Sequence, residues 1–346
     1  MATRSPVSEN FRVALLGCGR ISKSHFDAIS RIDGLHLVAV ADAVQSRAEA
    51  AGVANGVPSF GSLSEMVTAV DCDIVTVATP SGLHPVHGIE AARAGKHVVS
   101  EKPMAISLAG ADSLIDACAE AGVRLFVVKQ NRLNPAIQLV KRAVQKGRFG
   151  RIHSANCTVR WARPQEYYDQ APWRGTWAMD GGAFMNQASH YVDLIQWLAG
   201  PVEAVVAMTA TQERKIEAED SGAAVLRFQN GAIGVLDVTM LTYPKNLEGS
   251  LTILGDRGSV KIGGTAVNRV DTWLFEDYDD DDKLIESAAT TPPTVYGFGH
   301  QGYYRNVLRV LRGEAVPDTD GREGRKSLEI ILAIYESART GKAVSL

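Results

Sequence analysis

The chain has 346 residues, of which 45% are hydrophobic and 22% are charged, with a net charge of −3. This is an ordinary globular balance, and the length is sufficient for two domains with sizeable cores. Because the net charge is small and the basic residues are spread along the chain, nucleic acid and membrane surfaces are excluded as expected partners.

The cysteines and the N-terminus indicate the compartment. Cys18, Cys72, Cys118 and Cys157 show no CxxC or metal-like spacing, so free thiols are expected and no metal site is predicted. The N-terminal hexapeptide Met-Ala-Thr-Arg-Ser-Pro is polar and lacks the apolar region of a leader. No apolar run approaches the roughly 18 residues of a membrane helix, and a cytoplasmic protein is therefore expected.

Strand-like and helix-like segments alternate in the first third of the chain. Short apolar runs predict strands at 11–16, 35–41, 73–78, 97–99 and 124–128. Helices are predicted after Gly19 up to residue 30, and at 86–94 and 107–121. Short apolar strands that alternate with helices are typical of a parallel sheet covered on both faces, so we predict a doubly wound α/β domain over residues 1–130.

The pattern changes after about residue 130, and we predict a second α/β domain over residues 131–346. Asn134-Pro135 is a favourable N-cap and first position for a helix up to Lys146. Longer strand-like segments follow from Ile152, and Asn230-Gly231 predicts a hairpin with a type I′ turn. A mostly antiparallel sheet is expected, with one helix over 183–199 packed against it. Final helices are predicted at 299–312 and 322–340, as candidates to pack back on the first domain.

Four successive aspartates occupy positions 279–282 and precede Lys283. Like charges in a row usually form a solvated loop, which is the expectation here. Calcium binding is the alternative, but the alternating ligand spacing of a calcium loop is absent.

A glycine turn, Gly17-x-Gly19-x-x-Ser22, lies between the first strand and the first helix. Such glycines let the backbone approach a pyrophosphate at a helix N-terminus, with Ser22 small enough for the third position. Asp42 ends the second strand, where a carboxylate binds ribose hydroxyls and repels a 2′-phosphate, so NAD is predicted over NADP. The alternatives are a glycine turn without a ligand and an Asp42 that only forms a turn.

Two further segments follow strands at the edge where such sheets bind ligands. Thr79-Pro80-Ser81-Gly82-Leu83-His84 follows the third long strand, so Thr79 and His84 are candidates to contact the cofactor, or members of an ordinary polar loop. Glu101-Lys102-Pro103 follows the next strand, which places Lys102 beside the expected nicotinamide. Lys102 either polarises a substrate hydroxyl or is a surface lysine.

The segment from Gly181 to Asp193 carries a second group of candidates. Asn186, His190 and Asp193 are spaced i, i+4, i+7, which is one face of a helix. His190 is a candidate base because its intrinsic pKa lies near neutrality, and the alternative is a structural histidine. Asn186 is a candidate to hydrogen-bond a substrate hydroxyl. Asp193 either orients His190 or serves the fold.

These motifs together resemble the Gfo/Idh/MocA oxidoreductase family. The resemblance rests on 17–21, 79–84, 101–103, Trp173-Arg174 and 181–193, which appear in the family's order. It implies a Rossmann domain, a second domain with an open antiparallel sheet, homotetramers, and catalysis by Lys102 and His190. The family often has aspartate where this chain has Asn186, which favours a hydrogen-bonding role. The NAD contacts implied are Gly17, Gly19, Arg20, Ile21, Asp42, Thr79, Ser81, His84, Glu101, Lys102, Gln130, Trp173 and Arg174.

A narrower resemblance is to UDP-N-acetyl-2-amino-2-deoxyglucuronate dehydrogenases, on 129–135, 158–161 and 299–304. It implies NAD-dependent oxidation of the C3 hydroxyl of UDP-N-acetylglucosaminuronic acid, in diacetylated diaminouronic acid and lipopolysaccharide synthesis. It leaves open whether 2-oxoglutarate accepts the hydride in a recycling step. The implied substrate contacts are Lys102, Asn131, Arg160, Asn186, His190 and Tyr303. Alternatives are an inositol or free-sugar dehydrogenase and, in another class, a non-catalytic NAD sensor.

The arginines of the second domain are compatible with an anionic substrate. Arg160, Arg163 and Arg174 lie near several aromatic residues in the sequence, and arginine binds carboxylates and phosphates through two hydrogen bonds. Arg160 is our choice for the uronate carboxylate. A cation–aromatic packing cluster without a ligand is the alternative.

Overall fold

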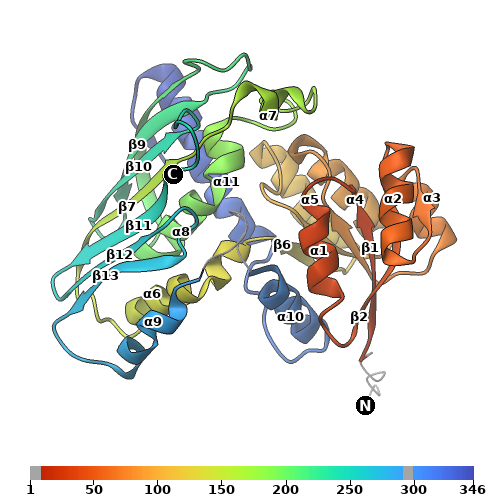
Figure 1. Ribbon diagram of the computed structural model, residues 1–346, viewed down its shortest axis with the longest axis horizontal. Helices are drawn as coiled ribbons and strands as arrows, with labels where there is room; N and C mark the ends of the chain where they lie inside the picture. The colour runs from red at the N-terminus through yellow and green to blue at the C-terminus, as the bar shows by residue number, and fades with distance from the viewer. Residues whose placement is uncertain (1–8, 291–298) are drawn as a thin grey trace. The chain divides into compact units, whose positions relative to one another are not determined.

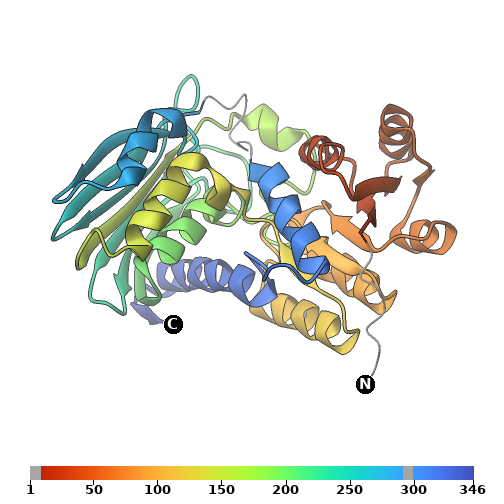
Figure 2. The same cartoon turned by 90° about the horizontal axis from the view of Figure 1, so that it is seen from below.

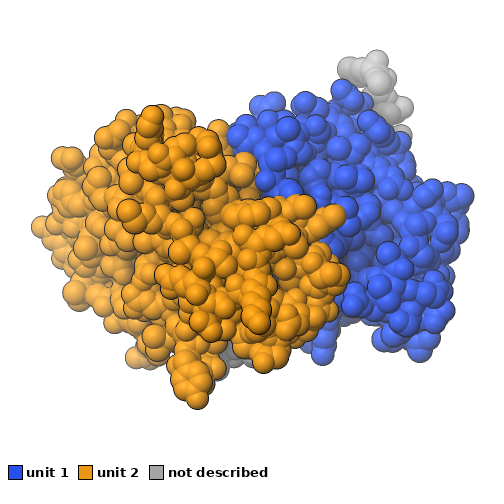
Figure 3. All heavy atoms as spheres, turned by 90° about the horizontal axis from the view of Figure 1, so that it is seen from above, with its two compact units in different colours: residues 1–128, 300–325 blue, residues 129–299, 326–346 orange. Residues whose placement is uncertain are grey.

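The computed structural model describes residues 9–290 and 299–346, so the polar N-terminal hexapeptide lies outside the described residues. The chain divides into two compact units, shown in separate colours in Figure 3. The first unit comprises residues 1–128 and 300–325, and the second comprises residues 129–299 and 326–346.

The first unit is built on a six-stranded sheet of order β3-β2-β1-β4-β5-β6, in which all neighbouring strands are parallel. Its strands are β1 (Phe11–Leu16), β2 (Leu35–Ala41), β3 (Ser59–Phe60), β4 (Ile74–Val77), β5 (His97–Ser100) and β6 (Leu125–Val127). β4 is buried along its whole length, as expected of a strand covered on both faces. The predicted parallel Rossmann sheet is confirmed.

Helices cover both faces of this sheet (Figures 1 and 2). They are α1 (Ser22–Ile29), α2 (Gln45–Asn55), α3 (Leu63–Ala69), α4 (His84–Arg93), α5 (Leu108–Glu120) and α10 (Gly299–Leu311). α5 begins where the Ser107 hydroxyl accepts the Gly110 N–H, which satisfies one of the unpaired donors of its first turn. α1 and α10 lie side by side, since His25 contacts Tyr304.

The second unit contains an eight-stranded sheet of order β13-β12-β11-β7-β10-β9-β8-β14. Neighbouring strands are antiparallel except for β7 and β10, which are parallel. Its strands are β7 (Ile152–Arg160), β8 (Val202–Ala210), β9 (Ser221–Phe228), β10 (Ile233–Thr239), β11 (Glu248–Gly255), β12 (Gly258–Gly263), β13 (Arg269–Phe275) and β14 (Val344–Ser345). The mostly antiparallel sheet predicted from the sequence is confirmed.

One face of this sheet carries helices and the other carries exposed side chains. The unit's helices are α6 (Pro135–Gln145), α7 (Gln165–Asp169), α8 (Ser189–Ala199), α9 (Ile285–Ala288) and α11 (Gly321–Thr340), which begins in the first unit. α8 packs on β7, where the Cys157 thiol donates to the Tyr191 carbonyl. The opposite face exposes a cross-strand row of Val206, Val225 and Val235.

Three local expectations need correction. The hairpin between β9 and β10 is present, but Asn230 lacks the positive φ of a type I′ turn, because only Gly231 adopts one there. Asn134 and Pro135 occupy the N-cap and the first turn of α6 as predicted, but the Asn134 side chain accepts no N–H of the helix, and its amide donates to the Ala266 carbonyl. The single helix expected over 183–199 is instead a π-helical turn at Ala183–Gln187 followed by α8.

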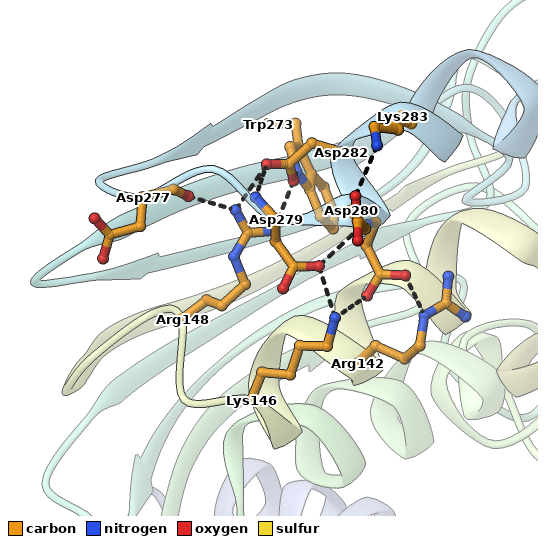
Figure 4. Close-up of polar contacts among 10 residues, drawn as sticks. Arg142, Lys146, Arg148, Trp273, Asp277, Asp279, Asp280, Asp282 and Lys283 are labelled. Carbon is orange, nitrogen blue, oxygen red and sulfur yellow. Dashed lines mark hydrogen bonds and ion pairs between the residues drawn. The ribbon is translucent and has the colours of Figure 1, made fainter.

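The aspartate run is not a simple solvated loop. It forms the short 3-10 helix Asp280–Leu284, and its side chains meet three basic residues from α6 and the turn after it, as Figure 4 shows. Asp282 accepts two hydrogen bonds from Arg148, at 2.6 and 2.9 Å, and one from the Trp273 indole. Only part of the run fits the expectation, since the Asp280 side chain is 89% exposed.

Candidate active site

The glycine turn after β1 has the shape that a dinucleotide requires. Gly17 has a φ of +99°, and a Cβ there would lie 2.5 Å from the Ala78 carbonyl, so only glycine fits. A Cβ at Gly19 would meet nothing within 4 Å, which leaves the backbone open to a ligand. Ser22 does more than fit closely, because its hydroxyl donates to the Gly19 carbonyl at 2.7 Å.

Asp42 follows β2 directly beside this turn. Its carboxylate accepts the N–H groups of Cys18 and Val44, both at 2.8 Å. This fixes a carboxylate at the carboxyl edge of the sheet, where a ribose is expected to bind. Burial, assisted by Asp42, raises the pKa of the Cys18 thiol to about 12, so this cysteine is a poor nucleophile. Arg20, by contrast, is exposed.

His84 connects the loops that follow β4 and β5. It is 1% exposed, and its ring nitrogens lie 2.7 Å from the Pro103 carbonyl and 2.8 Å from the Thr79 carbonyl. Burial lowers the pKa of His84. Because both nitrogens face backbone carbonyls, His84 positions these two loops, and its expected cofactor contact stays a prediction. Ser81, in the same loop, is also buried.

Glu101 is held in a buried hydrogen-bond network that the sequence did not reveal. His25 donates to Glu101 at 3.0 Å and contacts the Tyr304 hydroxyl at 2.9 Å, and Tyr304 in turn contacts Thr76 at 2.8 Å. Burial opposes the charge of Glu101, yet the His25 hydrogen bond, with His300 3.7 Å away, holds the pKa of Glu101 well below the usual range. The second oxygen of Glu101 accepts the Lys102 N–H, which ties this network to the candidate lysine.

Within residues 9–290 and 299–346, one cluster of side chains could hold a metal ion. It consists of His25, Glu101 and His300, whose ligand atoms lie within 4.8 Å of one another. The contact between His25 and Glu101 is a hydrogen bond, and the other nitrogen of His25 is engaged by Tyr304. Hydrogen bonds thus explain why His25 and Glu101 lie together in this cluster. Tyr303, a predicted substrate contact, belongs to the same unit and is 3% exposed.

His190 lies in the second unit near the start of α8. It is 7% exposed, and its Nε2 accepts the Gln130 side-chain amide at 3.1 Å. A ring nitrogen that accepts carries a lone pair, as a general base requires. Lys102 belongs to the first unit, so its convergence with His190 is a proposal. Asn131, beside Gln130, is 2% exposed.

Asp193 has cationic partners that the sequence did not identify. Its two oxygens accept hydrogen bonds from Arg132 at 2.6 and 2.7 Å, and the Lys129 ammonium lies 3.7 Å away. Burial opposes the charge of Asp193, but Arg132 and Lys129 lower its pKa. The expected pairing with His190 was based on helical spacing alone, whereas Arg132 lies 61 positions earlier in the chain.

Asn186 lies in the π-helical turn, before α8 begins. Its amide donates to Asp180, whose other oxygen accepts the Gly175 N–H at 2.8 Å. The neighbouring Gln187 accepts from Arg163 at 3.0 Å and donates to the Tyr167 hydroxyl at 3.0 Å. A π-helical turn is rare and occurs frequently at functional sites.

The arginines divide between the two faces of the sheet. Arg160 alternates with buried residues of β7, so it lies on the face opposite α8, where it pairs with Asp237 and lies 3.5 Å from Glu248. Arg163 lies beside Gln187, and the Arg174 guanidinium lies 4.2 Å from the Tyr167 ring centre. Because Arg160 is paired away from α8, we revise its expected substrate contact in favour of Arg163 and Arg174.

Comparison with known proteins identifies the family of the chain. Residues 11–129 match the family model for the oxidoreductase family NAD-binding Rossmann fold, and residues 141–346 match its C-terminal alpha/beta domain. The chain therefore belongs to the Gfo/Idh/MocA oxidoreductase family, and its first unit carries an NAD-binding Rossmann domain.

Three relatives illustrate the range of the family. The crystal structure of the WlbA dehydrogenase from Bordetella pertussis, in complex with NADH and UDP-GlcNAcA, is 55% identical, with a TM-score of 0.95 and coverage of 98% of this chain and 99% of that one. D-apiose dehydrogenase from Paraburkholderia graminis is 28% identical over 98% of this chain and 90% of its own. Myo-inositol 2-dehydrogenase from Thermotoga maritima is 29% identical over 72% of this chain and 74% of its own.

A helix that crosses a bilayer must be both long and apolar. Among the described residues, no helix combines the length and the apolar character needed to cross a bilayer.

Proposed function

We propose that this protein oxidises the C3 hydroxyl of UDP-N-acetylglucosaminuronic acid to a ketone with NAD. The observation that carries the proposal is the 55% identity, over nearly the whole of both chains, with a dehydrogenase whose crystal structure contains NADH and UDP-GlcNAcA. The glycine turn, the fixed Asp42 carboxylate and the buried histidine of α8 supply the groups that this reaction needs.

The residues of the first unit fit the cofactor. The open backbone at Gly19 and the N-terminus of α1 receive the pyrophosphate, and Asp42 receives the adenosine ribose. Arg20, Ile21, Thr79, Ser81 and Glu101 border the same edge of the sheet as further contacts. Gln130, Trp173 and Arg174 are the contacts assigned to the second unit. When bound, NAD supplies the hydride acceptor.

His190 and Lys102 perform the proton chemistry. The C3 hydroxyl takes the place of the Gln130 amide at Nε2 of His190 and gives its proton to that nitrogen, and the Lys102 ammonium stabilises the oxygen as negative charge develops. The Glu101 network holds the Lys102 backbone, which limits the positions its side chain can reach. The exchanged roles, with Lys102 as base, give the same products and are separated by the pH profiles of the two variants.

The charged groups of the substrate require cations, and the second unit offers two beside Asn186. We assign the uronate carboxylate to Arg163, because that arginine contacts Gln187 in the π-helical turn. Arg174 stacks on Tyr167 and has a buried Nε with no partner in the described chain, which leaves it able to bind a phosphate oxygen. Asn131, Asn186 and Tyr303 remain assigned to the sugar.

The decisive experiment incubates the pure protein with NAD and UDP-N-acetylglucosaminuronic acid, with and without 2-oxoglutarate. NADH absorbance and the mass of the 3-keto sugar are followed together. We expect the ketone in at least one condition, and 2-oxoglutarate dependence indicates that NADH is recycled in place. No ketone in either condition overturns the proposal.

Lys102→Ala and His190→Asn test the mechanism. Each is expected to lower kcat by about 10²-fold or more, because each removes a group that acts in the transition state. Arg160→Ala is the matched control, since Arg160 lies on the other face of the sheet. Near-normal turnover in both test variants contradicts the mechanism.

The second candidate is an inositol or free-sugar dehydrogenase, favoured by the similarity to myo-inositol 2-dehydrogenase. Turnover of inositol without any response to UDP-sugars identifies it. A non-catalytic NAD sensor is a candidate of another class, and it binds NAD but reduces none with any sugar. Lys102 and His190, which a sensor does not need, speak against it.

The proposal extends to the compartment, the oligomeric state and the pathway in which the reaction takes place. We expect a cytoplasmic homotetramer that serves lipopolysaccharide synthesis, with 2-oxoglutarate as a candidate hydride acceptor. The open sheet face supports the oligomer, because Met208 is 82% exposed beside the row of valines and large apolar patches usually mark interfaces. Sedimentation measures the oligomer, and a monomer contradicts this part.

A further inference from the structure

The π-helical turn that carries Asn186 is capped by a carboxyl group from a distant strand. A helix leaves its first N–H groups without partners inside the helix. Here the Ala183 N–H donates to the Glu219 carbonyl at 2.9 Å, and the Phe184 N–H donates to the Glu219 carboxyl at 2.8 Å. Glu219 lies two positions before β9, so the cap is supplied across 35 residues of sequence.

Tyr335 of α11 completes this cap. Its hydroxyl accepts the Met185 N–H at 3.1 Å and donates to the same Glu219 oxygen at 2.9 Å. Three successive N–H groups of the turn are therefore satisfied by Glu219 and Tyr335. The site has no role in the proton transfer or in the charge recognition described above.

The glycine pair before the turn leaves room both for this carboxyl group, at Gly182, and for Met185, at Gly181. A Cβ at Gly182 would lie 1.8 Å from the second carboxyl oxygen of Glu219, so the carboxyl packs directly on the glycine backbone. Gly181 has a φ of +73°, and a Cβ there would lie 2.4 Å from the Met185 Cβ. The Gly-Gly pair and Glu219 thus form one fitted unit that sets where the turn begins.

We propose that Glu219 is a positioning residue for the sugar oxidation: with Tyr335 it fixes the register of the π-helical turn and so presents Asn186 and His190 to the substrate. The inference rests on the proposed function. Asn186 immediately follows Met185, the last residue with a capped N–H, and His190 is the second residue of the following helix. A slip of the turn by one residue moves both groups, and a displacement of about 1 Å costs about 10²-fold in rate.

The test compares Glu219→Ala with Glu219→Gln. Glutamine keeps the oxygen that accepts from Phe184 and Tyr335, so we expect its kcat within about threefold of the wild type, whereas alanine lowers kcat by about 10²-fold. The KM for NAD is expected to change little in both. Glu217→Ala is the matched control, because Glu217 is exposed, lies two positions away and accepts the Trp177 N–H, which is outside the turn.

Amide hydrogen exchange separates this proposal from the proposed function. In Glu219→Ala the peptide covering 183–187 is expected to exchange at least about tenfold faster, while wild type, Glu219→Gln and Glu217→Ala stay alike. Tyr335→Phe, which keeps the ring, is expected to speed exchange at Met185 and to lower kcat less, so it serves if Glu219→Ala fails to fold. If the wild type forms no ketone, the proposed reaction is overturned. The exchange result alone then tests whether Glu219 caps the turn. Equal kcat and exchange in Glu219→Ala, or an equal loss in Glu219→Gln, overturns the positioning role.

Discussion

Asp193 and Glu219 are both buried carboxylates that hold the segment from Ala183 to Ala199, at 1% and 2% exposure. Asp193 is met by Arg132 and Lys129, and its pKa is lowered despite burial. Glu219 is met only by neutral donors within the described chain, and burial raises its pKa to about 7. The two sites show that burial alone does not set the charge of a carboxyl, because a cation at hydrogen-bond distance outweighs the cost of desolvation.

This difference predicts different consequences of mutation. Asp193 is a fixed charge, and its removal takes a carboxylate away from two buried cations. Glu219, with its pKa raised to about 7, is partly protonated at neutral pH, so its shape and hydrogen bonds matter more than its charge. The predictions that follow change one site at a time and measure whether the expected asymmetry appears.

The largest effect is expected for Asp193→Asn. The variant removes the buried carboxylate that Arg132 and Lys129 share, so we expect a loss of about 3–5 kcal/mol in the free energy of unfolding. Denaturant titration of the variant and the wild type measures the loss. The double variant Arg132→Met/Asp193→Leu removes both members of the strongest pair and is expected to recover about half of it. A loss below about 1 kcal/mol in Asp193→Asn contradicts the assignment of Asp193 as a compensated charge.

The next effect is a pH dependence that Glu219 imposes on stability. The folded pKa of about 7 exceeds the usual value of 4.5, so the folded state holds this proton more tightly than the unfolded chain does. Stability from this group is fully present below pH 4.5 and is lost as the pH rises through 7, by about 3 kcal/mol in total. Tyr335 faces Glu219 as a hydrogen-bond donor, and Asp220 faces it as a charged group that raises the Glu219 pKa further.

Glu219→Gln removes this titration. The melting temperature of the variant, relative to the wild type, is therefore expected to rise between pH 5 and pH 8. Glu217→Ala, an exposed neighbour, provides the baseline. If the curves of melting temperature against pH are parallel for Glu219→Gln and the wild type, Glu219 is ionised across this range. It then does not differ from Asp193 in its charge.

A steric test comes third. Gly182→Ala places a Cβ against the second oxygen of Glu219, and overpacking of this kind costs about 1–3 kcal/mol. The double variant Gly182→Ala/Glu219→Ala removes the opposing atoms, so its loss is expected to be smaller than the sum of the two single losses. Denaturant titration of all four proteins gives the coupling energy. Additive losses indicate that the two residues do not share a contact.

The sequence predicted those parts of the fold that depend on local patterns. Phe11–Leu16 and Leu35–Ala41 match the expected strands because continuous apolar runs between turns are typical of a doubly covered sheet. The glycine turn was likewise recognisable, because its backbone shape requires glycine at Gly17. The helical extent of 183–199 was not, since the π-helical turn depends on partners at Glu219 and Tyr335 that no local pattern reveals.

The site shows the same division between local and distant determinants. Lys102 and His190 were visible as candidates because they belong to short motifs at strand and helix ends. The partners that fix their surroundings come from elsewhere: His25 and Tyr304 hold Glu101, and Arg132 pairs with Asp193. We prefer Arg163 to Arg160 for the uronate, because the period-2 pattern of buried residues along β7 assigns Arg160 to the open face.

The smallest effect is expected in the acidic run, which contains both kinds of environment within three residues. Asp280→Asn removes a partner of Lys283, but the two side chains are 89% and 66% exposed, so water replaces the interaction and no measurable change in melting temperature is expected. Asp282→Asn is the matched comparison, because that carboxylate is 15% exposed, accepts from Arg148 and Trp273, and has its pKa lowered to about 2, chiefly by the Arg148 hydrogen bond. Thermal unfolding in low and high salt measures both variants. A loss for Asp280→Asn equal to that for Asp282→Asn contradicts the view that the strength of a carboxylate pair in this protein follows its burial and its cation together.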